Sequence, residues 1–322
     1  MKNIAVVFGG FSGEDVVSVK SAATILKHID KIKNRVFKVN LSKKGWDVCD
    51  LDDNLWAINK SDFSFSRLDE SIVVDGVINI IHGTPGEDGK LQGYFDMLGI
   101  PYNGCDVLVS SLTFNKGFCN HYLKQQGITV ADSILLTTSD EIDSEKILAH
   151  VGLPCFVKPN DGGSSIGVSK VSEKGQLNQA ISNAFFVSDR VLIESFVQGV
   201  EITCGVINLN GTVTPLAVTE IEFESDFFDF EAKYNSSSTK EITPARISEE
   251  DYNKTMELSK RIYQILGCKG FFRADYILEN GELFLIEVNT VPGMSSASLM
   301  PQQLEYANIN VTELLQFQID NL

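Results

Sequence analysis

The chain has 322 residues, of which 27 are basic and 43 acidic, and its formal charge is −16. This length allows about two or three domains with cores of their own, and 43% hydrophobic with 22% charged residues is ordinary for a globular enzyme. The acidic balance argues against nucleic acid or a membrane surface as a partner, because both are anionic.

Cysteine usage and apolar runs indicate the compartment. The six cysteines form no CxxC pair and there are only four histidines, which argues against a zinc site. Most of the cysteines have apolar neighbours and are typical of buried, reduced thiols. The apolar run at 4–8 is too short for a signal peptide, and no stretch reaches the about 20 apolar residues that span a membrane. We expect a cytoplasmic protein.

Residues 1–104 are predicted to form an α/β domain. The expected strands are short apolar runs at 4–8, 36–39 and 77–81. Residues from 14 to about 29 have apolar side chains at helical spacing. Such a βαβ pattern is typical of parallel strands joined by crossover helices. The turn formers at 99–104 mark the end of the domain.

Two loops of this domain carry candidate ligand-binding side chains. A glycine-rich loop that ends in Glu14 follows the first strand, and His82 begins the loop after the third, ahead of Gly86-Glu87-Asp88-Gly89. Taken singly, Glu14 is explained as an acid at a helix N-terminus and His82 as a packing residue. Together they favour a small-ligand site, since ligands of open α/β sheets bind beyond the carboxyl ends of the strands.

Residues 105–197 are expected to form a second lobe. Its predicted elements are helices near 113–126 and 173–186 and strands at 155–158, 167–171 and 191–194. A loop rich in glycine and serine at 161–167 follows Lys158. Its backbone N–H groups could cradle a phosphate, although a plain hairpin loop explains these residues about equally well. The loop matches neither the P-loop nor the GxGxxG pattern.

Residues 198–322 are expected to form a third lobe. Its predicted elements are strands at 201–208, 212–219, 271–278 and 283–288 and a helix at 249–266. Asn280-Gly281 predicts a hairpin between the last two strands. The polar stretch at 220–247 is long enough for a lid or binding loop. Within it Lys233 and Tyr234 could close over a phosphate, but an ordinary surface turn is the simpler explanation of these two residues alone.

Four polar residues on the predicted hairpin form a candidate metal site. Residues two apart on a strand face the same way, so Arg273 shares a face with Asp275, and Glu287 shares one with Asn289. If the two faces coincide, the carboxylate and amide oxygens suit Mg²⁺, which takes a few carboxylates and completes its shell with phosphate and water. A solvent-exposed hairpin face is the alternative, and the aliphatic residues that alternate with these side chains argue against it.

Taken together, these segments resemble the D-alanine–D-alanine ligase family of the ATP-grasp superfamily, from Val6 to Pro301. The most specific segments are His82 with Gly86-Glu87-Asp88-Gly89, Gly163-Ser164-Ser165-Ile166-Gly167, Glu231-Ala232-Lys233-Tyr234, and Glu287-Val288-Asn289-Thr290 with Pro292-Gly293-Met294. The resemblance implies an α/β protein of the ATP-grasp fold with an N-terminal Rossmann-like parallel-sheet domain. It also implies a cytoplasmic homodimer that makes D-alanyl-D-alanine for peptidoglycan through a D-alanyl phosphate.

The resemblance further implies a role for each matched residue. ATP would contact Lys116, Lys158, Ser165, Glu194, Phe196, Val197, Glu201, Lys233 and Asn289. Two Mg²⁺ ions, for which Mn²⁺ could substitute, would be held by Asp275, Glu287 and Asn289. The first D-alanine would lie at Glu14, Val17 and His82, and the second at Ser298 and Leu299. Arg273 and the Gly293 N–H would stabilise the oxyanion, and Ser164 and Tyr234 would form a hydrogen-bonded unit with Glu14.

Several alternatives stay open at this point. Tyr234 favours a dipeptide product, because a histidine often stands there in relatives that make a D-alanyl–D-lactate ester. D-serine or D-lactate as second substrate, or a different acid in another ATP-grasp ligase, would use the same phosphate chemistry. A catalytically silent nucleotide binder is disfavoured by the full set of metal ligands, lysines and Arg273. A dinucleotide-dependent oxidoreductase is disfavoured by the missing GxGxxG.

Overall fold

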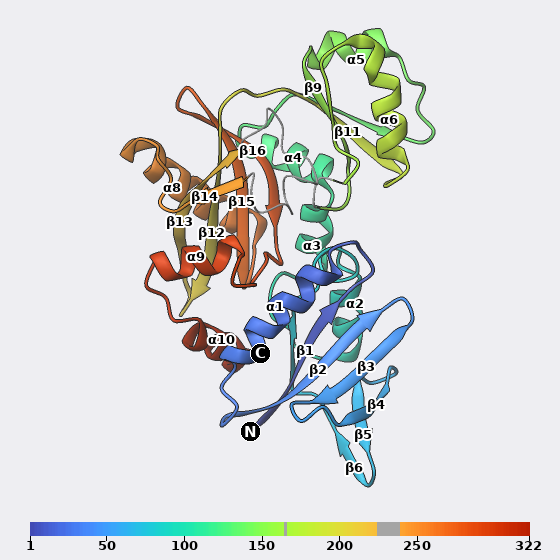
Figure 1. Ribbon diagram of the computed structural model, residues 1–322, viewed down its shortest axis with the longest axis vertical. Coiled ribbons are helices and arrows are strands. Elements are labelled where there is room, and N and C mark those ends of the chain that lie inside the picture. Colours follow the sequence, from blue (N-terminus) through green and yellow to red (C-terminus); the bar gives the residue numbers. More distant parts are fainter. Residues whose placement is uncertain (164–165, 224–238) are drawn as a thin grey trace.

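A computed structural model describes residues 1–163, 166–223 and 239–322. Three β-sheets follow one another along the chain, and helices pack against each of them (Figure 1). The first and second sheets lie at opposite ends of the molecule, and the third lies between them (Figure 1).

The first sheet has seven strands in the order β6-β5-β4-β3-β2-β1-β7. Its strands are β1 (Lys2–Gly9), β2 (Asn34–Ser42), β3 (Gly45–Asp50), β4 (Leu55–Asn59), β5 (Ser64–Arg67), β6 (Glu70–Ile72) and β7 (Gly76–Asn79), and its helices are α1 (Asp15–His28) and α2 (Lys90–Leu98). The predicted βαβ unit is confirmed, because β1 pairs in parallel with both β2 and β7. Residues 4–7 are fully buried, which explains their continuous apolar run.

Strands β3 to β6 form an antiparallel extension of this sheet that the sequence pattern did not predict. They are short, and most of their residues are partly or fully exposed, so no continuous apolar run marks them. An aromatic cluster closes their inner face, in which Phe63 packs edge-on against Phe65 and Phe95. The contact of Phe63 with Phe95 joins residues far apart along the chain, which a periodicity within one segment cannot reveal.

The second sheet has four strands in the order β10-β9-β11-β8, and all its pairings are antiparallel. Its elements are β8 (Ser133–Thr137), α5 (Ser144–Val151), β9 (Cys155–Pro159), β10 (Ser169–Val171), the short 3₁₀ helix η1 (Lys174–Gln176), α6 (Leu177–Phe185) and β11 (Arg190–Ser195). The three predicted strands and the helix are confirmed. Strand β8 and helix α5 were not predicted, since β8 buries only one of its five residues fully.

Two helices, α3 (Val107–Phe114) and α4 (Lys116–Gln125), connect the first sheet to the second. The single helix expected near 113–126 is therefore wrong at its start, because the chain breaks at Asn115. Asn115 has extended backbone angles, and its side-chain oxygen accepts a hydrogen bond from the Phe118 N–H at 3.1 Å. This is an N-cap, which satisfies one of the free N–H groups at the start of α4. It also places Lys116 at the first position of that helix.

The third sheet has five antiparallel strands in the order β14-β13-β12-β15-β16. Its elements are β12 (Val200–Leu209), β13 (Thr212–Phe223), β14 (Thr239–Ile242), α8 (Glu249–Leu266), β15 (Phe271–Glu279) and β16 (Glu282–Asn289). The predicted hairpin between β15 and β16 is confirmed, and both of its turn residues, Asn280 and Gly281, have positive φ. The expected loop at 220–247 is shorter than predicted, because β13 continues to Phe223 and β14 occupies Thr239–Ile242.

The chain ends in two helices that were not predicted, α9 (Leu299–Tyr306) and α10 (Val311–Asp320). Leu314 and Leu315 of α10 share a buried core with Ile4 of β1 and Ile25 of α1, so the C-terminal segment stabilises the first sheet (Figure 1). Among the helices of the described ranges, none is long and apolar enough to cross a membrane.

Candidate active site

A cavity of about 820 Å³ lies where loops of the first sheet meet helix α4 and the third sheet. We call it the cleft. It brings together predicted site residues that are up to 285 positions apart, from Glu14 to Leu299. The predicted residues that line it are Glu14, Val17, His82, Lys116, Glu201, Arg273, Asp275, Glu287, Asn289, Gly293, Ser298 and Leu299. The convergence of these side chains in one cavity is the main structural finding about the site.

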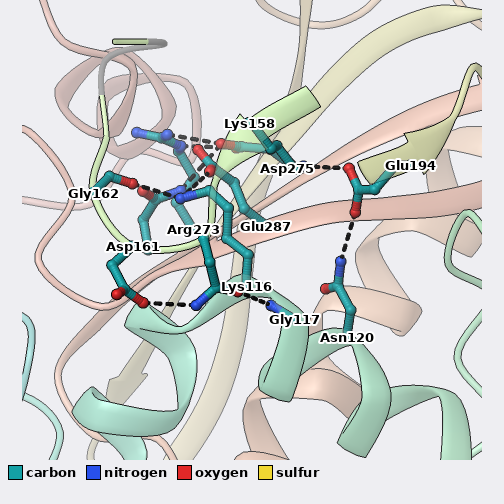
Figure 2. Close-up of polar contacts among 12 residues, drawn as sticks. Lys116, Gly117, Asn120, Lys158, Asp161, Gly162, Glu194, Arg273, Asp275 and Glu287 are labelled. Carbon is teal, nitrogen blue, oxygen red and sulfur yellow. Dashed lines mark hydrogen bonds and ion pairs between the residues drawn. The ribbon is translucent and has the colours of Figure 1, made fainter. Parts of the chain in front are cut away.

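Strands β15 and β16 hold the polar cluster of the cleft. In their register Asp275 is opposite Glu287, and Arg273 is opposite Asn289. The two faces therefore coincide, which is the condition that the sequence analysis set for a shared metal site. The Asn289 side-chain N–H donates to Asp275 Oδ2 at 3.1 Å. Arg273 donates to both Asp275 oxygens at 2.8 Å (Figure 2).

The cluster has the donor chemistry of a magnesium site. The described residues hold no group of three or more His, Cys, Asp or Glu side chains arranged for a metal ion, so a metal would depend on an amide oxygen or on the substrate as well. Asp275 and Glu287 supply two carboxylates, and Asn289 supplies an amide. This set suits Mg²⁺, which is commonly held by one or two carboxylates and by phosphate oxygens.

Arg273 is the counterion of the cluster. Burial opposes its charge, but the nearby carboxylates of Asp275, Glu287 and Glu87 outweigh burial and raise the pKa of Arg273. Thr203 on β12 donates a further hydrogen bond to Asp275 Oδ1 at 2.5 Å. Thr203 was not predicted, because nothing in the local sequence of β12 distinguishes it from other strand threonines.

The two predicted phosphate-binding lysines that the structure describes have different partners (Figure 2). Lys116 donates to the Gly162 carbonyl of the glycine-rich loop and lies 3.4 Å from Glu287 Oε2. Lys158 forms a buried ion pair with Glu194 across β9 and β11. A cation held between two backbone or carboxylate oxygens can exchange them for phosphate oxygens at small geometric cost.

Asn120 on α4 is an additional residue at this ion pair. Its side-chain N–H donates to Glu194 Oε1 at 3.2 Å, while its side-chain oxygen is buried with no hydrogen-bond partner among the described residues (Figure 2). Nothing in the local sequence distinguishes Asn120, which occupies an ordinary helix position.

Phe196 and Val197 follow directly after β11, next to this ion pair. The Phe196 ring packs against Phe156 at a centroid distance of 5.9 Å, and the ammonium of Lys170 lies 4.6 Å from the Phe196 centroid. An aromatic face on an apolar wall suits a nucleobase. Lys158, Glu194, Phe196 and Val197 lie outside the lining of the cleft as the described residues define it.

The glycine-rich loop approaches the first sheet. A Cβ atom built on Gly163 would lie 2.7 Å from Glu14 Oε1, so the backbone of the loop runs directly against this carboxylate. The contact brings together residues of the first and second predicted lobes at the mouth of the cleft. Ser164, Ser165, Lys233 and Tyr234 lie outside the described residues.

His82 lines the cleft and is buried. Its Nδ1 lies 2.7 Å from the Val291 carbonyl oxygen, and its Nε2 lies 3.1 Å from Ser21 Oγ. Burial lowers the pKa of His82, against the opposing effect of Glu14. The sequence allowed two interpretations of His82, a packing residue and a ligand-site residue. The structure shows that it is buried and also lines the cleft.

Glu87 and Ser21 are further polar residues of this region. The Glu87 carboxylate accepts hydrogen bonds from the Gly83 N–H at 2.7 Å and the Val291 N–H at 3.1 Å. Burial, together with the negative charge of Glu14, raises the pKa of Glu87 to about 8. Ser21 was missed because a serine in an amphipathic helix has no distinctive pattern, whereas Glu87 stands in a motif that the sequence did single out.

Gly293 and Ser298 lie in the segment that leads from β16 to α9. A Cβ atom on Gly293 would be 2.7 Å from Ser298 Oγ, so the absence of a side chain there lets the two approach. Ser298 Oγ lies 2.7 Å from Ser295 Oγ. Leu299 begins α9 and lines the cleft beside them.

Comparison with known proteins identifies relatives of the whole chain. Residues 3–105 match the family model "D-ala D-ala ligase N-terminus", and residues 122–320 match "D-ala D-ala ligase C-terminus". The chain is 48% identical over 324 residues to a D-alanine–D-alanine ligase of Azobacteroides pseudotrichonymphae, with 100% of both chains covered. It is 46% identical over 321 residues to the enzyme of the same name from Phocaeicola vulgatus, with 99% of each covered.

Solved structures give the same result. The VanG D-Ala:D-Ser ligase of Enterococcus faecalis is 33% identical and superposes with a TM-score of 0.86, over 99% of this chain and 98% of the other. The D-alanyl-alanine synthetase A of Vibrio cholerae is 28% identical and superposes with a TM-score of 0.88, over 99% and 98%.

Proposed function

Because the chain belongs to the D-alanine–D-alanine ligase family, we propose that the cleft is the active site in which it joins two D-alanines at the expense of ATP. The chain is an ATP-dependent ligase with the ATP-grasp fold, and its product, D-alanyl-D-alanine, serves peptidoglycan synthesis. The observation that carries the assignment of the cleft is the cross-strand cluster of Arg273, Asp275, Glu287 and Asn289 beside Lys116.

In the first step, a carboxylate oxygen of the first D-alanine attacks the γ-phosphorus of ATP, and ADP leaves. The product, D-alanyl phosphate, has the good leaving group that a free carboxylate lacks. Lys116 and Lys158 would exchange their present oxygen partners for phosphate oxygens. Asp275, Glu287 and Asn289 would hold magnesium, in our proposal two ions, which offsets the negative charge on the transferring phosphoryl oxygens.

Nucleotide specificity is assigned to the wall beside the second sheet. Phe196 and Val197 would line the base pocket, and Glu194 and Glu201 would accept hydrogen bonds from the adenine and ribose. When Lys158 binds a phosphate, its ion pair with Glu194 is broken. Glu194 can then accept a hydrogen bond from a donor on the base.

The first D-alanine would lie against the first sheet. Its ammonium group would pair with the Glu14 carboxylate, and Val17 and His82 would contact the remainder. Glu14 already has a hydrogen-bonding or electrostatic interaction within the protein, so substrate binding would add to an organised group. Ser164, Ser165, Lys233 and Tyr234 keep the roles that the family resemblance gives them, as proposals.

In the second step, the amine of the second D-alanine attacks the acyl carbon, the peptide bond forms, and inorganic phosphate leaves. Ser298 and Leu299 would anchor this substrate, and Arg273 with the Gly293 N–H would face the developing oxyanion. Donors that are already in place before the charge develops lower the barrier most, because they need no reorganisation during the reaction.

We also propose a division of labour along the chain. Residues 1–104 would bind the first D-alanine, residues 105–197 would bind nucleotide, and residues 198–322 would supply the metal and second-substrate residues. We further propose that the enzyme acts in the cytoplasm as a homodimer. Sedimentation of the purified protein tests the dimer.

The proposed function is tested by ADP release from ATP and Mg²⁺ with D-alanine, L-alanine, D-serine or D-lactate, together with the product mass. We expect release that depends on D-alanine, and a dipeptide product. An ester formed with D-lactate would overturn the second-substrate specificity but keep the mechanism. No release with any of them would overturn the assignment of the cleft.

A further inference from the structure

A buried chain of hydrogen bonds links helix α1 to the segment after β16. Ser21 of α1 has no exposed surface. Its hydroxyl oxygen accepts a hydrogen bond from the Met294 N–H at 3.0 Å and lies 3.1 Å from His82 Nε2. Met294 is also fully buried, so each polar group here depends on the others for its hydrogen bonds.

The proton positions in this chain follow from the acceptors. The Val291 carbonyl, 2.7 Å from His82 Nδ1, can only accept, so Nδ1 carries the proton. In the neutral ring Nε2 is then an acceptor, and the Ser21 O–H donates to it. The groups that face the ring are the carboxylate of Glu14, which favours its charged form, and the guanidinium of Arg273, which opposes it. Burial opposes the charged form of His82 most strongly and lowers its pKa, so the ring is neutral.

These contacts fix the backbone on both sides of Gly293. The Val291 carbonyl is held by His82 and the Val291 N–H by Glu87, while the Met294 N–H is held by Ser21. Between them lie Pro292, which has no N–H, and Gly293. Within the described residues the Gly293 N–H donates no hydrogen bond, so it is the one donor of this stretch available to a substrate oxygen.

We propose that Ser21 is a positioning residue for ligation, whose hydroxyl couples His82 to the Met294 backbone and thereby aims the Gly293 N–H at the reacting carbonyl. This inference rests on the proposed function. The same helix carries Val17 one turn earlier, and Val17 Cγ1 lies 4.0 Å from the position of a Cβ on Gly293. Helix α1 therefore links the site of the first substrate to the N–H that would receive its oxyanion.

Ser18 offers a matched control on the same helix. It too has no exposed surface, and its hydroxyl also makes two hydrogen bonds, from the Gly9 N–H at 3.0 Å and to the Ile80 carbonyl at 2.7 Å. Both partners of Ser18 lie in the first sheet or directly after it. Loss of the Ser18 hydroxyl should lower the stability of the fold without changing the backbone position of Gly293.

The test compares Ser21→Ala with Ser18→Ala in the full-length enzyme. We expect similar losses of thermal stability, because each variant loses one buried hydroxyl with two partners. Only Ser21→Ala should lower kcat with D-alanine, by about tenfold, with the KM for ATP unchanged. Its affinity for a phosphinate dipeptide, whose tetrahedral phosphorus mimics the adduct, should fall by the same factor as kcat/KM.

Equal kcat values in the two alanine variants would overturn the inference, and so would a kcat loss without loss of phosphinate affinity. If Ser21→Ala does not fold, Ser21→Cys gives the comparison, because it keeps the size and a weak donor. We expect a kcat for Ser21→Cys below that of the wild type, and a wild-type value would overturn the inference. Failure of the wild-type enzyme to release ADP with D-alanine would instead count against the proposed function.

Discussion

Arg273 donates to both carboxylate oxygens of Asp275, two residues further along β15, and each distance is 2.8 Å. With Thr203 and Asn289, this gives each oxygen of Asp275 two donors. A magnesium ion that uses Asp275 must therefore displace one of these donors, and we expect the displaced donor to be Arg273. The displaced guanidinium then becomes available to the reacting carbonyl, so metal binding and oxyanion stabilisation are coupled through one ion pair.

Replacement of Arg273 by methionine tests this coupling. Without the guanidinium, Asp275 loses two strong hydrogen bonds that compete with a metal, so Mn²⁺ should bind more tightly in the absence of nucleotide, by about tenfold. The same variant should lose kcat by about 100-fold, because an oxyanion donor is missing. Titration of Mn²⁺ by electron paramagnetic resonance and ADP release measure the two effects.

Arg273→Lys is the control for charge alone. It keeps the positive charge but not the planar fork that engages both oxygens, so its metal affinity should lie between those of the wild type and Arg273→Met. Metal affinities that are equal in all three proteins would show that Arg273 does not compete with the ion.

The buried ion pair of Lys158 and Glu194 predicts that a second substitution can restore the stability lost with Lys158 without restoring the affinity for ATP. Lys158→Met leaves Glu194 buried without its cation, which should lower the free energy of unfolding by about 3–5 kcal/mol. It should also weaken ATP binding. Adding Glu194→Gln to this variant removes the uncompensated charge and should restore most of the stability.

The double variant should still bind ATP weakly, because the phosphate-binding cation is still missing. Denaturant unfolding gives the stabilities, and calorimetry gives the ATP affinities. Recovery of ATP affinity in the double variant would show that Lys158 acts on Glu194 alone and does not hold a phosphate.

The sequence was most informative where one segment carries its own signal. The run at residues 4–8 predicted a buried parallel strand, and the strand alternation predicted that Arg273 shares a face with Asp275 and that Glu287 shares one with Asn289. The alternation of side chains along a strand and the residue types of a hairpin turn depend only on neighbouring residues, so the sequence alone is enough to predict them.

The sequence was least informative where contacts cross between sheets. Ser21, Thr203 and Asn120 gain their importance from partners 61 to 273 positions away, and none of them has a local signature. The break at Asn115 was missed because a polar residue within a helical pattern is equally compatible with a continuous helix and with an N-cap. The antiparallel strands β3–β6 were not predicted, because buried and exposed residues in them do not form a continuous apolar run.

Glu87 predicts a pH dependence of stability. The usual carboxyl pKa is 4.5, and the folded protein raises it to about 8, mainly through burial. Between these values the folded state binds more protons than the unfolded state, so stability falls as pH rises from 4.5 to 8. His82 acts in the opposite direction, because its pKa is lowered from 6.5, and its contribution is lost as pH falls below 6.5.

The range from pH 6.5 to 8 therefore isolates Glu87 from His82. The wild-type melting temperature should fall across this range. Glu87→Gln, which cannot ionise, should melt at a temperature that changes less, even though it loses an acceptor for one of the two N–H groups. Parallel curves for the two proteins would mean that Glu87 is already ionised at pH 6.5.

The contact between Gly163 and Glu14 predicts a variant with a selective defect in substrate binding. Gly163→Ala places a Cβ 2.7 Å from Glu14 Oε1, and the flexible carboxylate is the group that must move. The backbone of Gly163 does not need a positive φ, so alanine adds no backbone strain. Displacement of Glu14 should raise the KM for D-alanine by about tenfold, because the ammonium loses its counterion, while the KM for ATP changes little.

Gly175→Ala is the matched control. A Cβ at Gly175 meets no atom within 4 Å, and this glycine lies in the same part of the chain without a positive φ. Both variants should retain the wild-type melting temperature, and only Gly163→Ala should change the dependence of ADP release on D-alanine concentration. A rise in the KM for ATP alone would show that Gly163 affects nucleotide binding and not the position of Glu14. The proposed pairing of Glu14 with the ammonium group of the first substrate would then lose its support.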